Sequence, residues 1–326
     1  MKKNIAVIRG GYSSEFAVSE KSKDTIINHL STEEYKIFSI CINQDTRNAE
    51  QNGEKYPIDK NDFSLRDKQG KKILFDFAYI TIHGTPGEDG ILQGYFEMIG
   101  VPYSGCNVST SALTFNKFFC NQFLKSFGMN IAESIHLHQN EDYNAQEIIQ
   151  KIGLPCFVKP NLGGSSFGIS KVKKEEEIEN AIKNAFKESP EIIIEKAIIG
   201  TEVTCGCFKR KGEVIALPIT EIVTHREFFD YTAKYQGEVE EITPARININ
   251  LTKRIQELTR EIYQLIGAEG IIRIDYIIQE ENIYILEINT TPGMTETSLI
   301  PQQIQTAGIK LGEVLEEIIN EALKKG

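Results

Sequence analysis

The chain has 326 residues and lacks any apolar run long enough to span a membrane. It also lacks internal repeats, low-complexity tracts and heptad patterns. Its first residues contain two lysines and then a short apolar run that ends at Gly10 and Gly11. We interpret this start as a first β-strand and not as a signal peptide. These absences favour a globular protein without a membrane partner.

Basic residues and cysteines are also few. Lys and Arg number 36 against 46 Asp and Glu, and the formal net charge of −10 argues against a nucleic-acid partner. The 6 cysteines show no paired CxxC spacing, so we expect reduced, mostly buried thiols in a cytoplasmic protein. Cys205 and Cys207 are expected on one face of a core strand. The length allows two or three domains.

The strongest pattern is the stretch 271–299. Two runs rich in Ile and Tyr, 271–279 and 283–289, predict a β-hairpin. A turn centred on Glu281 would place Asp275 opposite Glu287, and Arg273 opposite Asn289. The other face would then carry the apolar residues Ile272, Ile274, Tyr276, Ile278, Tyr284, Leu286 and Ile288.

Two facing carboxylates repel each other unless a cation lies between them. Asp275, Glu287 and the amide oxygen of Asn289 together offer the hard oxygen ligands that Mg²⁺ prefers. Arg273 would add a fixed positive charge beside them. The alternative is a solvated hairpin face with cross-strand charge pairs, which explains Arg273 but not the facing acids. We therefore favour a metal site.

The first third of the chain predicts a small open parallel sheet. Strands are expected at 4–8, 36–42 and 77–82, and helices at 18–30 and 92–99. Residues 43–72 are polar and are expected to be irregular surface segments. Ligands of such sheets bind at the carboxyl ends of the strands, where the glycine loops 10–15 and 83–90 would lie.

The rest of the chain predicts a mixture of strands and helices. One helix is expected over 109–127 with Lys117 inside it, and residues 224–246 are expected to form a functional loop with aromatic side chains. The other expected elements are helices at 141–152, 175–188, 252–266 and 309–322, strands at 156–159, 169–172 and 191–195, and a hairpin of 201–208 with 213–220.

Three loops could carry chemistry. The glycine- and serine-rich loop 160–168 follows Lys159, and its N–H groups could hold phosphate, although it lacks the Walker A ending. The connection 195–202 could bind a purine through its backbone, with Glu202 near the ribose. The turn 290–295 contains Pro and Gly, and its N–H groups could stabilise an oxyanion. The alternatives are, in order, a flexible turn, an interdomain linker and a routine turn after a strand.

Taken in order along nearly the whole chain, these segments resemble the ATP-grasp ligases, and among them most closely the D-alanine–D-alanine ligase family. The resemblance rests on residues 10–19, 83–94, 101–105, 111–117, 158–168, 195–202, 230–235, 273–275 and 287–299. Each motif is short and unspecific by itself, whereas the ordered set is specific.

The resemblance implies an α/β fold of the α+β ATP-grasp type. A Rossmann-like open parallel sheet would form an N-terminal substrate domain over 1–105. A central ATP-grasp subdomain over 106–190 and a C-terminal catalytic subdomain over 191–326 would then hold ATP between them.

The resemblance also implies a two-step reaction. ATP would phosphorylate the carboxylate of one D-alanine, and the amine of a second D-alanine would attack the acyl phosphate to give D-alanyl-D-alanine for peptidoglycan. The implied cofactors and partners are ATP as a substrate, two Mg²⁺ or Mn²⁺ ions, D-alanine and a second copy of the chain in a homodimer.

Roles follow from the resemblance for residues that match the family's motifs. The residues implied to bind ATP are Lys117, Lys159, Ser165, Ser166, Glu195, Lys196, Ala197, Ile198, Glu202 and Lys234. Those implied to bind the metal ions are Asp275, Glu287 and Asn289. For the substrates they are Glu15, His83, Lys234, Arg273, Ser298 and Leu299. Catalysis would involve Glu15, Ser165, Tyr235, Arg273, Gly293 and Ser298.

The chain departs from the expected pattern at 161–163, at Phe167 and at Ala197, which takes a position that is aromatic in some relatives; the chain has no Trp. Alternative functions are a ligase with D-serine or D-lactate as acceptor, or another carboxylate–amine ligase. Tyr235 after Lys234 favours the dipeptide-forming version. A nucleotide-binding module without activity is disfavoured by the complete acidic set, and a dinucleotide oxidoreductase by the glycine spacing at 9–13.

Overall fold

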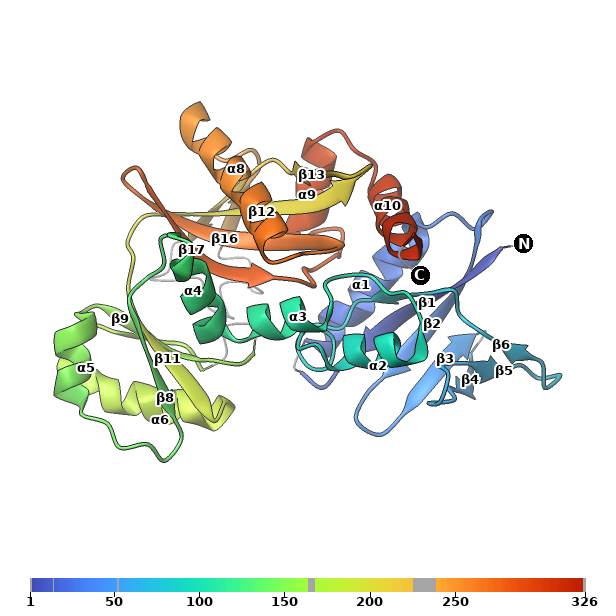
Figure 1. The fold of residues 1–326 in the computed structure, drawn as a ribbon, viewed down its shortest axis with the longest axis horizontal. Coiled ribbons are helices and arrows are strands. Elements are labelled where there is room, and N and C mark those ends of the chain that lie inside the picture. Colours follow the sequence, from blue (N-terminus) through green and yellow to red (C-terminus); the bar gives the residue numbers. More distant parts are fainter. Residues whose placement is uncertain (1, 14, 52, 164–167, 225–238, 325–326) are drawn as a thin grey trace.

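The structure is a computed structural model that describes residues 2–13, 15–51, 53–163, 168–224 and 239–324 (Figure 1). Three main sheets of five, four and six strands form the described part, together with a two-stranded ribbon. The five-stranded sheet lies at the N-terminus, the four-stranded sheet in the middle of the chain and the six-stranded sheet after it.

The N-terminal sheet is mixed: its three expected strands are parallel, as predicted, and two antiparallel strands extend it. Its parallel part consists of β1 (Lys3–Gly10), β2 (Tyr35–Ile42) and β7 (Phe77–Ile80). Helices α1 (Phe16–His29) and α2 (Ile91–Ile99) accompany it. Six of the eight β1 residues are buried, as the apolar pattern predicted.

The polar segment 43–72 contains four short strands and is not irregular. Strands β3 (Arg47–Gln51) and β4 (Glu54–Pro57) extend the N-terminal sheet antiparallel to β2, and β5 (Leu65–Arg66) pairs with β6 (Lys72–Ile73). In β3 and β4 only Ala49 is buried. Edge strands of this kind bury too little apolar surface to show the alternation by which strands are recognised.

The helix expected over 109–127 is two helices, α3 (Val108–Phe115) and α4 (Lys117–Ser126). Asn116 separates them in an extended conformation, with φ −87° and ψ 101°. Its side chain accepts a hydrogen bond from the Phe119 N–H and so caps α4. Lys117 therefore lies at the start of a helix and not inside one.

The central sheet has the order β10 (Ser170–Val172), β9 (Cys156–Pro160), β11 (Glu191–Lys196) and β8 (Ser134–His138). Helices α5 (Ala145–Ile152) and α6 (Ile178–Glu188), the latter preceded by the turn η1 (Glu175–Glu177), cover one face with a shared apolar core. Helix α4 lies over the other face near β11. Strand β8 was not expected, since it is an edge strand with alternating histidines.

The C-terminal sheet has the order β15 (Val239–Ile242), β14 (Thr220–Thr224), β12 (Thr201–Arg210), β16 (Ile271–Gln279) and β17 (Asn282–Asn289). Strand β13 (Glu213–Ala216) forms the expected hairpin with β12 but ends earlier than predicted. Helix α8 (Ile249–Leu265) packs on this sheet.

The hairpin of β16 and β17 is confirmed, with a different turn. Only two residues, Glu280 and Glu281, connect the strands, and Gln279 pairs with Asn282. That register alone would place Asp275 opposite Leu286. An irregularity between Asp275 and Tyr276 shifts it by one residue, so that Asp275 pairs with Glu287.

Because of the same shift, the buried face of β17 differs from the expected one. Ile283, Ile285 and Ile288 are the buried residues of β17, whereas Tyr284 and Leu286 are only half-buried. The two Ile residues nearest the turn thus replace Tyr284 and Leu286 in the core.

Helices α9 (Leu299–Thr306) and α10 (Leu311–Leu323) end the chain, and α9 was not expected. Both helices share one apolar core with β1 and α1 of the N-terminal sheet. In Figure 1 the C-terminal helix accordingly lies beside α1. This core packs β1 and α1 directly against the two helices that follow β17.

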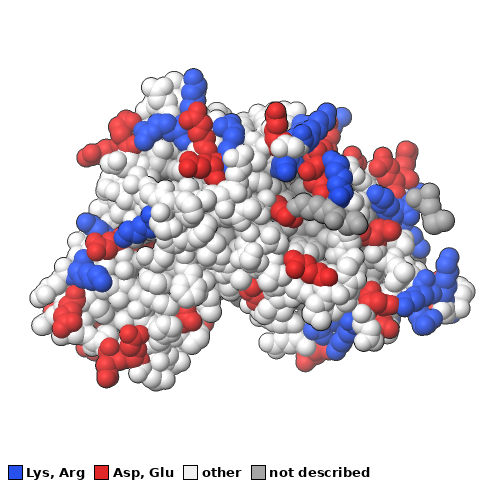
Figure 2. All heavy atoms as spheres, viewed as in Figure 1, with Lys and Arg blue, Asp and Glu red and all other residues white. Residues whose placement is uncertain are grey.

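The cysteine and charge predictions can be compared with the structure. All 6 cysteines are free thiols, and every one except Cys41 is buried, as expected. Lys and Arg are interspersed with Asp and Glu on the face drawn in Figure 2. Among the described residues, none of the helices combines the length and the apolar character that crossing a membrane requires.

Candidate active site

The end of the β16–β17 hairpin that lies away from its turn brings the three predicted metal ligands together. We call this pair of strands the acidic hairpin. Asp275 pairs with Glu287 across the two strands, and Arg273 pairs with Asn289. The side chains of Asp275 and Arg273 are nearly enclosed, with 14% and 9% exposed, whereas that of Glu287 is 44% exposed. The site is therefore closed at Asp275 and Arg273 and open to solvent at Glu287.

Arg273 clamps Asp275 with two hydrogen bonds. Its Nε and Nη2 donate to the two carboxylate oxygens at 2.8 Å and 2.7 Å, and its Nη2 lies 4.0 Å from Glu287 Oε1. Thr204 Oγ1 on β12 donates to Asp275 Oδ1 at 2.6 Å. Burial opposes the charged guanidinium, but Asp275 and the other nearby carboxylates together outweigh this effect and raise the pKa of Arg273.

Negative charge exceeds positive charge around this cluster. Burial, followed by the charges of Asp275 and Glu287, raises the pKa of Glu202 from 4.5 to about 7. Burial, together with the charges of Glu15 and Glu287, raises the pKa of Glu88 to about 7 as well. Arg273 does not neutralise all of these acids, so the cluster favours additional cations.

The residues present fit a divalent metal. Carboxylate and amide oxygens from Asp275, Glu287 and Asn289 suit Mg²⁺, and the open side at Glu287 leaves room for phosphate oxygens. Burial is the main cause of the raised pKa values of Glu88 and Glu202, and a cation bound beside them would favour their ionised forms.

The central sheet presents Lys159 toward this region. Its Nζ donates to Glu195 Oε2 at 2.6 Å, and Asn121 Nδ2 of α4 donates to the other Glu195 oxygen at 2.9 Å. Burial opposes the charged lysine, but Glu195 and more distant carboxylates together outweigh this effect and raise the pKa of Lys159. Glu195, predicted to contact ATP, thus fixes the lysine with its side chain.

The second predicted phosphate ligand, Lys117 at the start of α4, contacts the first residues of the glycine-rich loop. Its Nζ donates to the Gly163 carbonyl at 2.5 Å, and its backbone N–H donates to the Asn161 carbonyl at 3.2 Å. Asn161 is fully buried and accepts a bond from the Phe118 N–H at 2.8 Å. The break between α3 and α4 thereby places Lys117 against the loop.

The turn after β17 is built around Ser298. A Cβ on Gly293 would come within 2.9 Å of Ser298 Oγ, so any other residue here would displace the Ser298 hydroxyl. Ser298 Oγ accepts a bond from the Thr295 N–H at 3.1 Å and lies 2.7 Å from Thr295 Oγ1. Ser298 is the N-cap residue of α9 and Leu299 its first residue, where free N–H groups favour an anion.

This turn rests on the N-terminal segment, because the Met294 N–H donates to Ser22 Oγ of α1 at 3.2 Å. Glu15 is the N-cap residue of the same helix. His83 follows β7 and is buried, and its carbonyl accepts a bond from Ser13 Oγ at 2.9 Å. The structure thus brings the two glycine loops of the N-terminal sheet to the side of the acidic hairpin.

The segment proposed to bind a purine joins β11 to β12, as expected, and contains Lys196, Ala197 and Ile198. The Lys196 and Ala197 N–H groups donate to the carbonyls of Glu133 and Pro155. Ser165, Ser166, Lys234 and Tyr235 lie outside the described residues, and their roles stay predictions, as do those of the placed residues.

Sequence reasoning gave no role to Glu88, Asn121, Thr204 and Ser22. Glu88 accepts a bond from the Gly84 N–H at 2.7 Å and lies close enough to Arg273 to raise its pKa. Its place in the 83–90 motif was a signal that could have been used. The other three are common polar residues without any local signal.

Comparisons with known proteins agree with this arrangement. The family described as "D-ala D-ala ligase N-terminus" matches residues 4–106, and "D-ala D-ala ligase C-terminus" matches residues 123–320. A Bacteroides fragilis protein named D-alanine--D-alanine ligase is 54% identical over 323 residues, covering 98% of this chain and 99% of that protein.

Two solved structures extend the comparison. The VanG D-Ala:D-Ser ligase from Enterococcus faecalis has a TM-score of 0.87 at 31% identity and covers 98% of this chain and 99% of its own. The D-alanine--D-alanine ligase from Bacillus anthracis complexed with ATP has a TM-score of 0.80 at 32% identity, with 100% and 98% covered. The expected ATP-grasp fold is confirmed, and the chain belongs to the D-alanine–D-alanine ligase family.

Proposed function

We propose that this chain joins two molecules of D-alanine at the expense of ATP, which is converted to ADP. The observation that carries the proposal is the cluster of Arg273, Asp275, Glu287 and Asn289 beside the Gly293 turn, in a chain of this family. The dipeptide would serve peptidoglycan synthesis, and with it cell-wall formation and cell shape.

The first step needs ATP aligned with a carboxylate. Lys117 and Lys159 project from α4 and β9 beside the glycine-rich loop and would bind the phosphates, while residues 195–198 and Glu202 would hold the nucleoside. Phosphoryl transfer depends mainly on alignment and charge neutralisation. Mg²⁺ held by Asp275, Glu287 and Asn289 would supply that neutralisation, and we propose two such ions, with Mn²⁺ as a substitute.

The second step needs a stabilised oxyanion and an oriented amine. Arg273 and the Gly293 N–H would stabilise the tetrahedral oxyanion, for which fixed donors are effective. Glu15 and His83 would orient the first D-alanine. Ser298 and the Leu299 N–H at the start of α9 would bind the carboxylate of the second D-alanine. The side chains of Arg273 and Ser298 are already held by the contacts described above.

Ser165, Ser166, Lys234 and Tyr235 complete the proposal from the sequence alone. Ser165 and Tyr235 would connect to Glu15 and close the site over the acyl phosphate, which water would otherwise hydrolyse. Lys234 would assist the second carboxylate and the nucleotide, and Ser166 would bind phosphate.

A D-serine or D-lactate acceptor is the main alternative. One similar structure is named a D-Ala:D-Ser ligase, so the fold does not separate the acceptors. The relatives that are 51–54% identical over nearly the whole chain are named D-alanine--D-alanine ligases, which favours the dipeptide of D-alanine.

We further propose three domains, at 1–105, 106–190 and 191–326. Each is built on one main sheet, except that β11 at the start of the third range belongs to the central sheet. We also propose a cytoplasmic homodimer. Sedimentation of the purified protein distinguishes a dimer from a monomer by mass.

The proposed function is tested by supplying ATP, Mg²⁺ and single D-amino acids and by measuring ADP and dipeptide together. We expect ADP formation that requires D-alanine and yields one D-alanyl-D-alanine per ADP. If D-alanine supports ADP formation but a ligated product forms only when D-serine or D-lactate is also present, the alternative acceptors are favoured. Absence of any D-alanine-dependent ADP would refute the proposal.

A further inference from the structure

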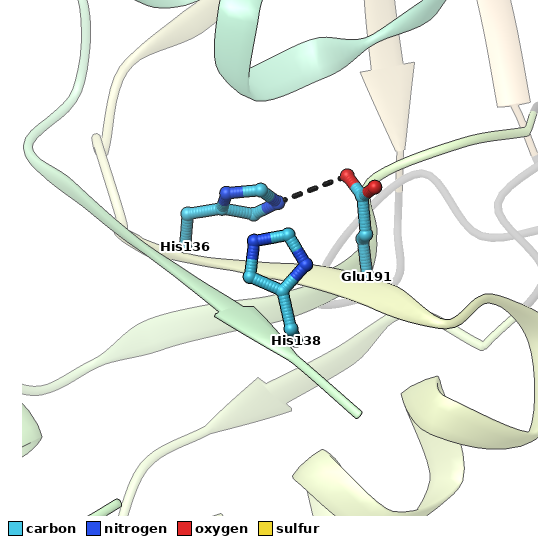
Figure 3. A group of neighbouring side chains, drawn as sticks. All are labelled: His136, His138 and Glu191. Atoms are coloured by element: carbon cyan, nitrogen blue, oxygen red, sulfur yellow. Dashed lines mark hydrogen bonds and ion pairs between the residues drawn. The ribbon is translucent and has the colours of Figure 1, made fainter. Parts of the chain in front are cut away.

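Two histidines and one glutamate form a cluster that the proposed reaction does not use (Figure 3). His136 and His138 are two residues apart on the edge strand β8, so their side chains project from the same face. Glu191 on β11 pairs directly with His138, which places its side chain on that face as well. The sequence alone did not reveal this cluster, because β8 was not predicted.

The possible ligand atoms are already close to one another. His136 Nε2 lies 3.1 Å from Glu191 Oε2, and all three groups offer ligand atoms within 4.8 Å of one another. Tetrahedral ligands about 2.0–2.1 Å from Zn²⁺ are roughly 3.3 Å apart. Two of the three ligands thus have nearly this spacing, and the His138 ligand atom lies within 4.8 Å of both.

Neighbouring residues hold the two inner ligands in place. The His136 ring stacks on Phe118 of α4, with centroids 4.6 Å apart and an interplanar angle of 16°. Glu191 Oε2 also accepts a hydrogen bond from Asn161 Nδ2 at 2.8 Å. His138 is exposed, so the cluster has a fixed inner side and an open outer side. Figure 3 shows the Glu191 carboxylate directed at the His136 ring, with the His138 ring beside them.

The cluster is separate from the acidic hairpin but adjoins the phosphate loop. His136 and Lys159 both pair with Ile193 of β11 from opposite sides, so they are two strand spacings apart, or about 9–10 Å. Asn161, the partner of Glu191, starts the loop that contacts Lys117. An ion bound at Glu191 would therefore adjoin the ATP-binding segment without replacing any residue assigned to it.

We propose that His136, His138 and Glu191 bind a transition-metal ion of the Zn²⁺ class, with at least one coordination position left to solvent. Imidazole nitrogen suits Zn²⁺, Co²⁺, Ni²⁺ and Cu²⁺, whereas Mg²⁺ prefers oxygen alone. The site therefore differs in metal preference from the hard oxygen site of the hairpin. The competing explanation is a hydrogen-bonded pair, His136 with Glu191, that stabilises β8 and binds no ion.

The test uses Co²⁺ as a spectroscopic probe of the full-length protein in excess Mg²⁺, which fills the oxygen site. We expect visible absorption of low-coordinate Co²⁺ that saturates at one equivalent and is abolished by Zn²⁺. Thiolate ligation would add an intense near-ultraviolet band, which we do not expect because the described ligands are nitrogen and oxygen.

Three variants make the assignment specific. His138→Asn leaves the His136–Glu191 hydrogen bond intact, and Glu191→Gln keeps the side-chain shape. Both should weaken Co²⁺ binding at least tenfold, since loss of even an outer partner of a metal ligand typically costs that much. His29→Asn, which changes an exposed histidine on α1, is the matched control and should bind Co²⁺ like the wild type.

Circular dichroism of each variant confirms that the fold is retained. If the wild type gives no saturable Co²⁺ absorption, or if His138→Asn and Glu191→Gln bind Co²⁺ as the wild type does, the site does not exist and the hydrogen-bonded pair alone explains the cluster.

Discussion

Glu202→Gln should make the protein without ligands more stable at alkaline pH. Glu202 lies on β12, and burial with the nearby charges of Asp275 and Glu287 raises its pKa from 4.5 to about 7. A carboxyl whose pKa is raised on folding adds stability below its unfolded pKa and loses that contribution as pH rises through the folded value. Ionised Glu202 therefore weakens the wild type above pH 7, and glutamine removes this cost.

The size of the effect follows from the shift. A change from 4.5 to about 7 corresponds to about 3 kcal/mol between pH 4.5 and pH 8, at 1.36 kcal/mol for each pKa unit. Glu202 keeps some contact with solvent, so we expect on the order of 1–3 kcal/mol. The melting temperature of the variant minus that of the wild type should therefore be a few degrees larger at pH 8 than at pH 5.

Glu221→Gln is the matched control with the opposite sign. The Arg246 hydrogen bonds lower the pKa of Glu221, so its contribution to stability is present at neutral pH and is lost as pH falls. This variant should be destabilised at pH 8 and approach the wild type in acid. Differential scanning fluorimetry across a pH series measures both. A Glu202→Gln difference that is independent of pH, or that falls from pH 5 to pH 8, would refute the reasoning.

Three further predictions concern the proposed reaction. Glu287→Gln should lower activity strongly and raise the Mg²⁺ concentration for half-maximal rate, and an unchanged Mg²⁺ dependence with full turnover would exclude it as a ligand. Gly293→Ala should push Ser298 from its position, so kcat/KM for D-alanine should fall at least tenfold while ATP binding by calorimetry is retained. Ser22→Ala leaves the Met294 N–H without its partner, at a cost of about 1–3 kcal/mol, and should lower kcat more than it alters KM for ATP; equal effects on both would contradict a role in positioning the turn.

The sequence predicted best the features that depend on neighbouring residues. The hairpin and the facing pair of Asp275 and Glu287 were correct because both lie on adjacent strands. The pairing was correct in spite of a wrong turn, since the irregularity beside Tyr276 restored the register. Buried strands with continuous apolar runs, such as β1, were also recognised.

Features that depend on distant residues or on edge positions could not be predicted in this way. Strands β3, β4 and β8 bury few side chains and so lack a clear period. Ser22 approaches Met294 only because α1 shares a core with the C-terminal helices. Asn116 ends one helix and caps the next, which the apolar pattern of 108–126 does not reveal.

The most direct test of the account follows the oxygen atoms of D-alanine. If the carboxylate attacks the γ-phosphoryl group and the amine then displaces phosphate, one carboxylate oxygen must leave with the phosphate. With D-alanine labelled by ¹⁸O in its carboxylate, we predict inorganic phosphate that carries one ¹⁸O per dipeptide formed, measured by mass spectrometry. Unlabelled phosphate accompanied by full dipeptide formation would contradict the acyl phosphate and, with it, the roles proposed for Arg273 and the Gly293 turn.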